Sequence, residues 1–98
     1  MKNEATTDIF PDIHGGEKPV TYCDLLEVIL RRDAAKMSDL LDIWPIIQVM
    51  RKCEDGEPIE LSHAQWGMID DKFNEGKWPT ADSFCQLAVA LQAEMASS

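Results

Sequence analysis

Apolar residues recur at intervals of three and four residues in four separate stretches of the chain, which is the spacing of one buried face of an α-helix. The stretches cover about residues 22–33, 38–53, 63–75 and 81–95. Short polar connections separate them, so they predict helices that pack against one another. The expected fold class is therefore all-α, a compact bundle of about four short helices in a single domain at about residues 21–98.

Three of these helices have polar residues at their expected N-terminal ends that can cap them. Thr21 with Asp24 three residues later is a variant of the capping box, and Ser62 with Gln65 is the standard form. Thr80 precedes the last helix. Because a cap side chain accepts a hydrogen bond from an otherwise unpaired backbone N–H, these three helix starts are well marked.

The second stretch contains Pro45, and its start is therefore ambiguous. A proline inside a helix removes one hydrogen bond and clashes with the preceding turn, at about 3 kcal/mol. Either Ser38 caps a helix that contains Pro45, or Asp42 is the cap and residues 35–41 form a separate short turn. In both cases the expected buried stripe consists of Leu41, Trp44, Ile46, Ile47, Met50 and Cys53.

Two other segments lack a helical period. Residues 1–20 contain prolines and glycines and predict an irregular N-terminal arm. Its apolar residues can anchor it to the core; they are Ile9, Phe10, Ile13 and Val20. In the turn at residues 54–58, Gly56 can take a positive φ. Residues 59–61 are then briefly extended, as a short strand or as a spacer.

Composition and charge narrow the range of functions. The chain has 98 residues, 45% apolar, with a formal net charge of −9. A chain of this size buries one core and leaves little room for a deep active-site cleft. Its charge opposes direct nucleic-acid binding, which relies on cationic side chains. Because the sequence shows neither a membrane span nor a secretory signal, it predicts a cytoplasmic protein without a membrane partner.

Candidate residues for catalysis or metal binding are few. Cys23, Cys53 and Cys85 are widely spaced and predict free thiols. Neither they nor His14 and His63 have the close spacing of zinc ligands. No calcium loop or catalytic motif occurs, so no metal or cofactor is expected. Cys23 lies near a helix start, where the dipole favours a thiolate, but no motif places a base beside it, and a buried structural thiol is the preferred interpretation.

Negative charge is concentrated in residues 54–75. Seven carboxylates there, against Lys72 alone, contribute −6 of the net −9, whereas residues 21–53 are neutral. Such a concentration is either a solvated face or a surface that steers a basic partner protein. Trp78, in the connector that follows, is either an exposed interface anchor or a cap on the core. The candidate protein-binding residues are Glu54, Asp55, Glu57, Glu60, Asp70, Asp71, Glu75 and Trp78.

Four short motifs of turn and cap residues follow one another along about residues 21–92. They are Thr21-Tyr22-x-Asp24-Leu25-Leu26, Glu54-Asp55-Gly56-x-x-Ile59-Glu60-Leu61, Ala64-x-Trp66 and Lys77-Trp78-Pro79-x-Ala81-Asp82. In order and spacing the chain resembles small uncharacterised acidic helical proteins of tailed bacteriophages and prophages, and it departs from them at Pro45 and across residues 33–37. The resemblance brings no catalytic residues. It implies a phage context in the host cytoplasm, where small acidic proteins often bind host proteins.

The sequence therefore favours a non-enzymatic protein that binds and inhibits a host protein with a basic surface. One alternative is a DNA mimic that inhibits a nucleic-acid-binding enzyme or a defence complex. The neutral stretch at residues 21–53 argues against a mimic that extends over the whole molecule. Another alternative is a phage assembly or virion accessory protein, for which symmetric self-association would be the sign.

Overall fold

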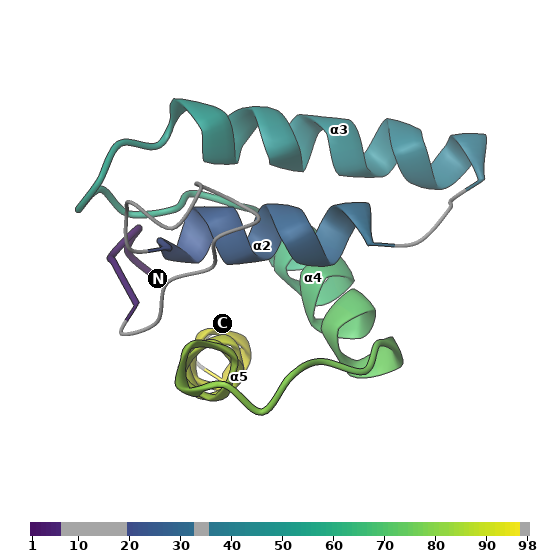
Figure 1. The fold of residues 1–98 in the computed structure, drawn as a ribbon. Coiled ribbons are helices and arrows are strands. Elements are labelled where there is room, and N and C mark those ends of the chain that lie inside the picture. Colours follow the sequence, from purple (N-terminus) through teal and green to yellow (C-terminus); the bar gives the residue numbers. More distant parts are fainter. Residues whose placement is uncertain (7–19, 33–35, 97–98) are drawn as a thin grey trace.

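The computed structural model describes residues 1–6, 20–32 and 36–96, which contain four helices (Figure 1). The helices are α2 (Tyr22–Arg31), α3 (Met37–Lys52), α4 (His63–Glu75) and α5 (Asp82–Ala96). Within these residues β-pairing is limited to two isolated bridges. The predicted all-α fold class is confirmed. None of the described helices has the length and apolar content that a membrane-spanning helix needs.

Side-chain caps fix the starts of α2 and α4, as predicted. The Thr21 hydroxyl accepts a hydrogen bond from the Asp24 N–H at 3.4 Å, and the Asp24 carboxylate accepts one from the Thr21 N–H at 3.0 Å. Ser62 and Gln65 make the same reciprocal pair at 3.2 and 2.9 Å. Since each box satisfies two backbone N–H groups within three residues, these starts follow from local sequence alone.

The predicted starts of the other two helices need correction. α3 begins after Lys36, which makes no side-chain cap hydrogen bond, so neither Ser38 nor Asp42 caps it. The helix continues through Pro45, so the part of the first alternative that places Pro45 inside the helix is confirmed, whereas its Ser38 cap is wrong. α5 begins one residue later than predicted, because the first helical hydrogen bonds run to the Ala81 carbonyl. In both helices the sequence has a polar residue close to the helix start, but that residue does not occupy the N-cap position.

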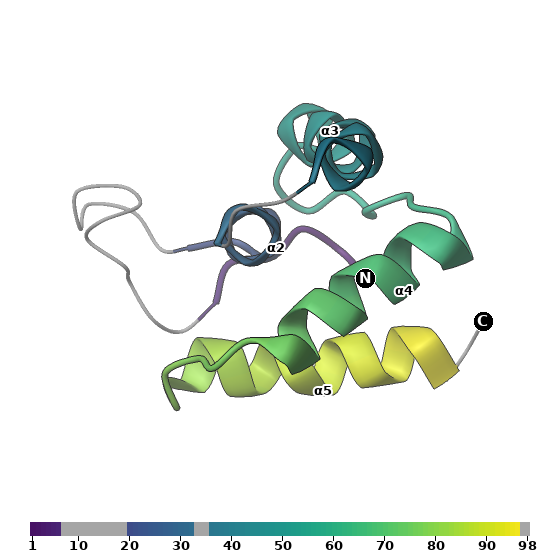
Figure 2. The same cartoon turned by 90° about the vertical axis from the view of Figure 1, so that its right-hand side faces the viewer.

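α2 lies at the centre of the bundle and contacts each of the other three helices. It runs antiparallel to α3, and Figure 2 shows this pair nearly end-on above α4 and α5, which run across the view. The core contains apolar side chains from all four helices and from the segments that flank them. Its buried residues are Val20, Cys23, Leu25, Leu26, Ile29, Leu30, Ile43, Ile46, Ile47, Met50, Ile59, Trp66, Ile69, Phe84, Leu87 and Leu91.

Three residues of the predicted α3 stripe are not among these buried residues. Cys53 follows the end of α3 and is partly buried against the core. Leu41 is 69% exposed and Trp44 is 48% exposed. α3 is apolar on most of its circumference and packs on α2, and its buried residues include Ile43, Ile46 and Met50. At about 100° per residue, Leu41 and Trp44 lie on another side of the helix. The expectation that they are buried was therefore wrong.

Residues 1–6, the start of the predicted arm, lie against the start of α2 and the α3–α4 connection. Asn3 and Thr6 are buried. Backbone hydrogen bonds join Asn3 to Glu57 and to Gly56, both at 2.8 Å, and Gly56 has the predicted positive φ, 85°. Val20 is fully buried, whereas the other proposed anchors, Ile9, Phe10 and Ile13, lie outside the described residues.

The sequence predicts an extended segment near residues 59–61. In the structure the pairing with the N-terminal residues involves residues 58 and 59, so it begins slightly before the predicted segment. Pro58 forms a bridge with Lys2, and the Ile59 N–H donates to the Met1 carbonyl at 2.8 Å. Ile59 is buried as a result. The segment therefore acts as a short paired spacer between α3 and α4.

Candidate functional site

The acidic residues of the candidate surface form two separate groups. Glu54, Asp55, Glu57 and Glu60 are exposed in the α3–α4 connection. Asp70, Asp71 and Glu75 lie on the second half of α4. Figure 1 shows the connection at one end of the molecule and the last turn of α4 at the other. The structure therefore does not bring the seven carboxylates together into one patch.

The α4 group belongs to a groove between α3 and α4 with a volume of about 480 Å³. One face of α4 forms most of it, because its lining positions recur every three or four residues. α3 contributes an aspartate and an isoleucine four residues apart. The lining residues are Asp39, Ile43, Ala64, Gly67, Met68, Asp71, Lys72 and Glu75.

The groove combines a small apolar floor with an acidic rim. Ala64 and Gly67 have little or no side chain, which leaves a hollow beside Met68 and the buried Ile43. Around this floor stand three carboxylates against the single ammonium of Lys72, a local net charge of −2. Such a site can bury apolar groups of a partner while its rim attracts lysine or arginine side chains.

Asp39 is the residue of this groove that sequence reasoning missed. It lies in the stretch at residues 21–53 whose charges cancel, and no local motif separates it from the other carboxylates there. Its spacing of four residues from Ile43 places it on the buried edge of the helix. α3 and α4 both pack on α2, and this tertiary arrangement places Asp39 in the same groove as Asp71 and Glu75.

Trp78 is packed as a cap on the core and is partly exposed. Its ring stacks between Phe73 and Phe84, with centroid distances of 6.0 and 5.6 Å, and its indole N–H donates to the Phe73 carbonyl at 2.9 Å. The Arg32 guanidinium lies 4.7 Å from the ring centroid. Gly76 permits this approach, since a Cβ there would clash with the Arg32 guanidinium. These contacts agree with the capping interpretation of Trp78.

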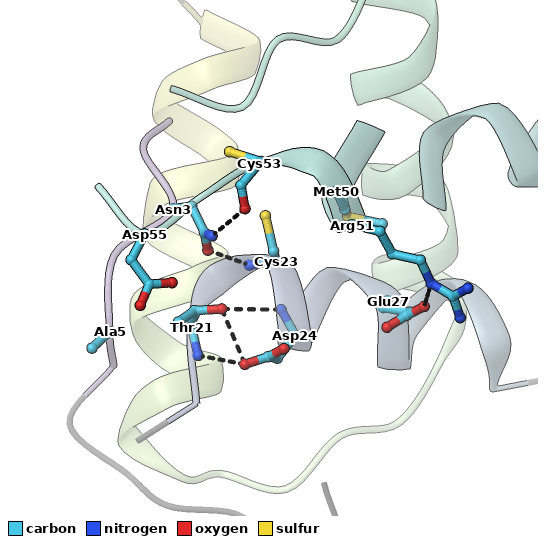
Figure 3. Close-up of a pocket in the computed structure, with 10 residues that line it drawn as sticks. All are labelled: Asn3, Ala5, Thr21, Cys23, Asp24, Glu27, Met50, Arg51, Cys53 and Asp55. Atoms are coloured by element: carbon cyan, nitrogen blue, oxygen red, sulfur yellow. Dashed lines mark hydrogen bonds and ion pairs between the residues drawn. The ribbon is translucent and has the colours of Figure 1, made fainter. Parts of the chain in front are cut away.

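A second hollow, about 370 Å³, lies where the N-terminal segment meets α2 and α3 (Figure 3). Asn3 joins the two helices there, because its amide donates to the Cys53 carbonyl at 3.2 Å and its oxygen accepts from the Cys23 N–H at 3.1 Å. Cys23 and Cys53 both line the hollow. The Asn3 side chain therefore links the start of α2 to the residue that follows α3.

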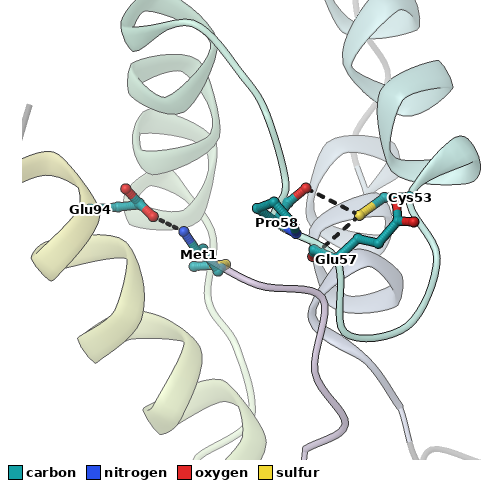
Figure 4. A network of polar contacts seen from close by, with 5 residues as sticks. All are labelled: Met1, Cys53, Glu57, Pro58 and Glu94. Carbon is teal, nitrogen blue, oxygen red and sulfur yellow. Dashed lines mark hydrogen bonds and ion pairs between the residues drawn. The ribbon is translucent and has the colours of Figure 1, made fainter.

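The surroundings of Cys23 keep its thiol protonated. The pKa of Cys23 is raised from 9.0 to about 12, chiefly by burial and in smaller part by the neighbouring Cys53, Asp24 and Asp55. The Cys53 thiol faces the carbonyl oxygens of Glu57 and Pro58, at 3.6 Å each (Figure 4). Burial therefore outweighs the helix dipole at Cys23, and the prediction that this thiol is buried is confirmed.

Figure 4 also shows the first residue of the N-terminal segment, Met1, whose amino group pairs with the Glu94 carboxylate of α5. The N-terminal segment thus contacts α2, the α3–α4 connection and α5. Across residues 1–6, 20–32 and 36–96, no three histidine, cysteine or acidic side chains are placed to hold a metal ion. The groove between α3 and α4 is the site with the clearest binding chemistry.

No family model matches the chain, and no curated protein or solved structure gives a match to it.

Proposed function

We propose that this chain is a non-enzymatic protein that binds a basic partner protein through the groove between α3 and α4. In the phage setting that the sequence resemblance implies, the partner is a host protein and the effect of binding is inhibition. The observation that carries the proposal is the placement of Asp39, Asp71 and Glu75, from two helices, around an apolar floor.

The shape of the groove favours a helical segment of the partner. On α4 the lining runs from Ala64 to Glu75, a rise of roughly 17 Å at about 1.5 Å per residue. That length matches about three turns of a partner helix. A helix with small apolar residues on one side and lysine or arginine beside them would place both groups against the floor and the rim.

The Cys23 pocket supports the non-enzymatic part of the proposal. A nucleophilic cysteine needs a stabilised thiolate and a nearby base. Cys23 has a raised pKa, and the carboxylates beside it raise that pKa further instead of activating the thiol. Among residues 1–6, 20–32 and 36–96, no histidine lines its pocket.

The test compares two charge reversals of equal size. Asp71→Lys with Glu75→Lys changes the groove, whereas Glu54→Lys with Glu57→Lys changes the exposed connection at the other end of the molecule. The partner is first captured from host lysate, and association rates are then measured at low and high salt. We expect the groove variant to slow association at least tenfold and the control to change it little, because steering depends on local complementarity.

Three outcomes would contradict this. Equal slowing by both variants would indicate that the overall negative charge matters, as in a DNA mimic. Association rates that change neither with the two charge reversals nor with salt would show that the carboxylates are only a solvated face. Retained biological effect after loss of groove binding would place the function elsewhere.

A further inference from the structure

α3 presents four large apolar side chains to solvent within its first two turns. Met37 is 77% exposed, Leu40 55%, Leu41 69% and Trp44 48%. We propose that this face, the α3 stripe, pairs with the same stripe of a second copy of the chain. In this pairing the two α3 helices cross antiparallel about a two-fold axis between Leu40 and Leu41. The stripe consists of Met37, Leu40, Leu41 and Trp44.

The spacing of the stripe is self-complementary. Its members occur at intervals of three, one and three residues, which read the same in both directions along the helix. An antiparallel two-fold contact therefore places Leu40 against Leu41 of the second copy and Met37 against Trp44 of the second copy. A two-fold interface requires this reciprocity, and methionine sulfur packs favourably on an aromatic ring.

Charge also favours a second copy on this side of α3. At about 100° per residue, Gln48 and Arg51 extend the stripe along the helix, and no carboxylate of α3 falls within the same arc. Asp39 and Asp42 lie on other sides of the helix. Two chains of net charge −9 repel each other, so they can approach most easily through a side of α3 on which the helix itself carries no carboxylate.

Arg51 holds Trp44 at the edge of this face. Its guanidinium lies 5.8 Å from the Trp44 ring centroid, and its Nε also donates to the Glu27 carboxylate at 3.1 Å. Glu27 in addition accepts from Arg31 at 3.2 Å. Tryptophan and arginine are the residue types most enriched at energetically dominant interface positions. The stripe is thus an apolar surface that is followed along the helix by the ion-paired Arg51.

The size of the stripe sets the expected affinity. An exposed apolar patch of this kind covers roughly 300–600 Å², less than the ~800 Å² per partner of a standard interface. The dimer is therefore expected to dissociate in the micromolar range or above. The groove between α3 and α4 lies on another side of α3 and stays open in the dimer, so this inference does not depend on the proposed function.

The experiment is sedimentation velocity from about 1 µM to about 1 mM, a range chosen to bracket that affinity. We expect the mass of the wild-type chain to rise with concentration from 11.0 kDa towards twice that value. Leu40→Glu with Leu41→Glu should weaken association at least tenfold. Val89→Glu is the matched control, because Val89 is an apolar residue of α5 with 69% exposure, and that variant should associate like the wild type. Circular dichroism confirms that each variant is folded.

A rescue variant distinguishes self-pairing from other uses of the stripe. Leu40→Lys alone should weaken the dimer. Leu40→Lys with Leu41→Glu should restore part of it, since each lysine then faces a glutamate of the second copy. A chain that stays monomeric up to about 1 mM would overturn the proposal. So would a dimer that survives Leu40→Glu with Leu41→Glu, or a stripe that binds only a different protein. Asp71→Lys should leave the dimer intact, which separates this result from failure of the groove proposal.

Discussion

Trp44 and Trp78 have similar local partners and opposite roles in the fold. Each has an arginine guanidinium over its ring, at 5.8 Å for Trp44 and 4.7 Å for Trp78. Trp78, in a loop, is stacked between two phenylalanines and donates a hydrogen bond to the backbone. Trp44, in the middle of a helix, is 48% exposed among other exposed apolar residues.

The difference shows what a hydrophobic stripe in a sequence indicates. Periodic apolar residues indicate that a helix has an apolar side, but not that the same chain covers it. α3 is apolar on most of its circumference, and α2 covers one part only. Trp78 has no helical period around it, yet Phe73, Phe84 and Arg32 meet it from three different segments.

The largest expected effect comes from comparing the two substitutions Trp78→Ala and Trp44→Ala. Trp78→Ala should lower the free energy of unfolding by about 2–4 kcal/mol, somewhat below the loss at a fully buried tryptophan, because the ring is partly exposed. Trp44→Ala should change it by less than about 0.5 kcal/mol, as at other surface positions. Urea denaturation followed by circular dichroism, at a concentration where the chain is monomeric, gives both values. Equal losses would mean that the two regions are packed alike.

The same comparison explains how much of the fold the sequence could predict. Thr21 and Ser62 act on backbone groups three residues away, so the starts of α2 and α4 were predictable. The side of α3 that faces α2 was not, because exposed Leu41 and buried Ile47 are equally apolar. Which side of α3 is buried depends on the residues of α2 that lie opposite it, and the local sequence of α3 does not contain that information.

The candidate site was predictable to a similar degree. Asp71 and Glu75 are four residues apart in a stretch that the sequence predicts to be helical, and the structure has them on one face of α4. It could not show that the acidic connection at residues 54–60 lies elsewhere, because that depends on the direction in which α4 leaves the turn. Asp39 joins the groove from α3 through tertiary packing alone.

A second test concerns the cost of Pro45 in the exposed part of α3. The helix continues through this residue, whose ring replaces the N–H that would bond to the Leu41 carbonyl. Pro45→Ala should therefore raise the free energy of unfolding by about 1–3 kcal/mol, because alanine restores the hydrogen bond and removes the clash. Gln48→Ala, one turn later on an exposed side, is the control and should have little effect. Unchanged stability in Pro45→Ala would mean that α3 has already adjusted to the proline.

A third and smaller test compares the starts of α4 and α3. Ser62→Ala should destabilise by about 0.5–2 kcal/mol, since the Gln65 N–H loses its acceptor. Ser38→Ala removes the same hydroxyl from the first turn of α3, where no side-chain cap is present, and should be nearly neutral. The difference between their denaturation midpoints measures the cap. If Ser38→Ala were the more damaging of the two, α3 would begin differently in solution.

The last test concerns the C-terminal end of α3, which is packed against other segments like the Trp78 region and unlike the Trp44 region. There Cys23 packs beside Cys53, and its pKa is raised from 9.0 to about 12, chiefly by burial. In the unfolded chain the thiol ionises near its ordinary value, whereas in the folded chain it stays protonated to a higher pH. Stability from the neutral thiol is therefore complete below about pH 9 and is lost as the pH rises towards 12.

Cys23→Ala should flatten this alkaline loss of stability relative to the wild type, although the variant starts from a lower value at neutral pH because a buried side chain is shortened. Cys85→Ala is the matched control: its thiol is exposed on α5, so its removal should leave the pH dependence unchanged. Urea midpoints measured between pH 7 and pH 11 for the three proteins give the slopes. Parallel slopes in wild type and Cys23→Ala would show that Cys23 ionises alike in the folded and unfolded chains. The end of α3 would then be open to water in the way that its first two turns are.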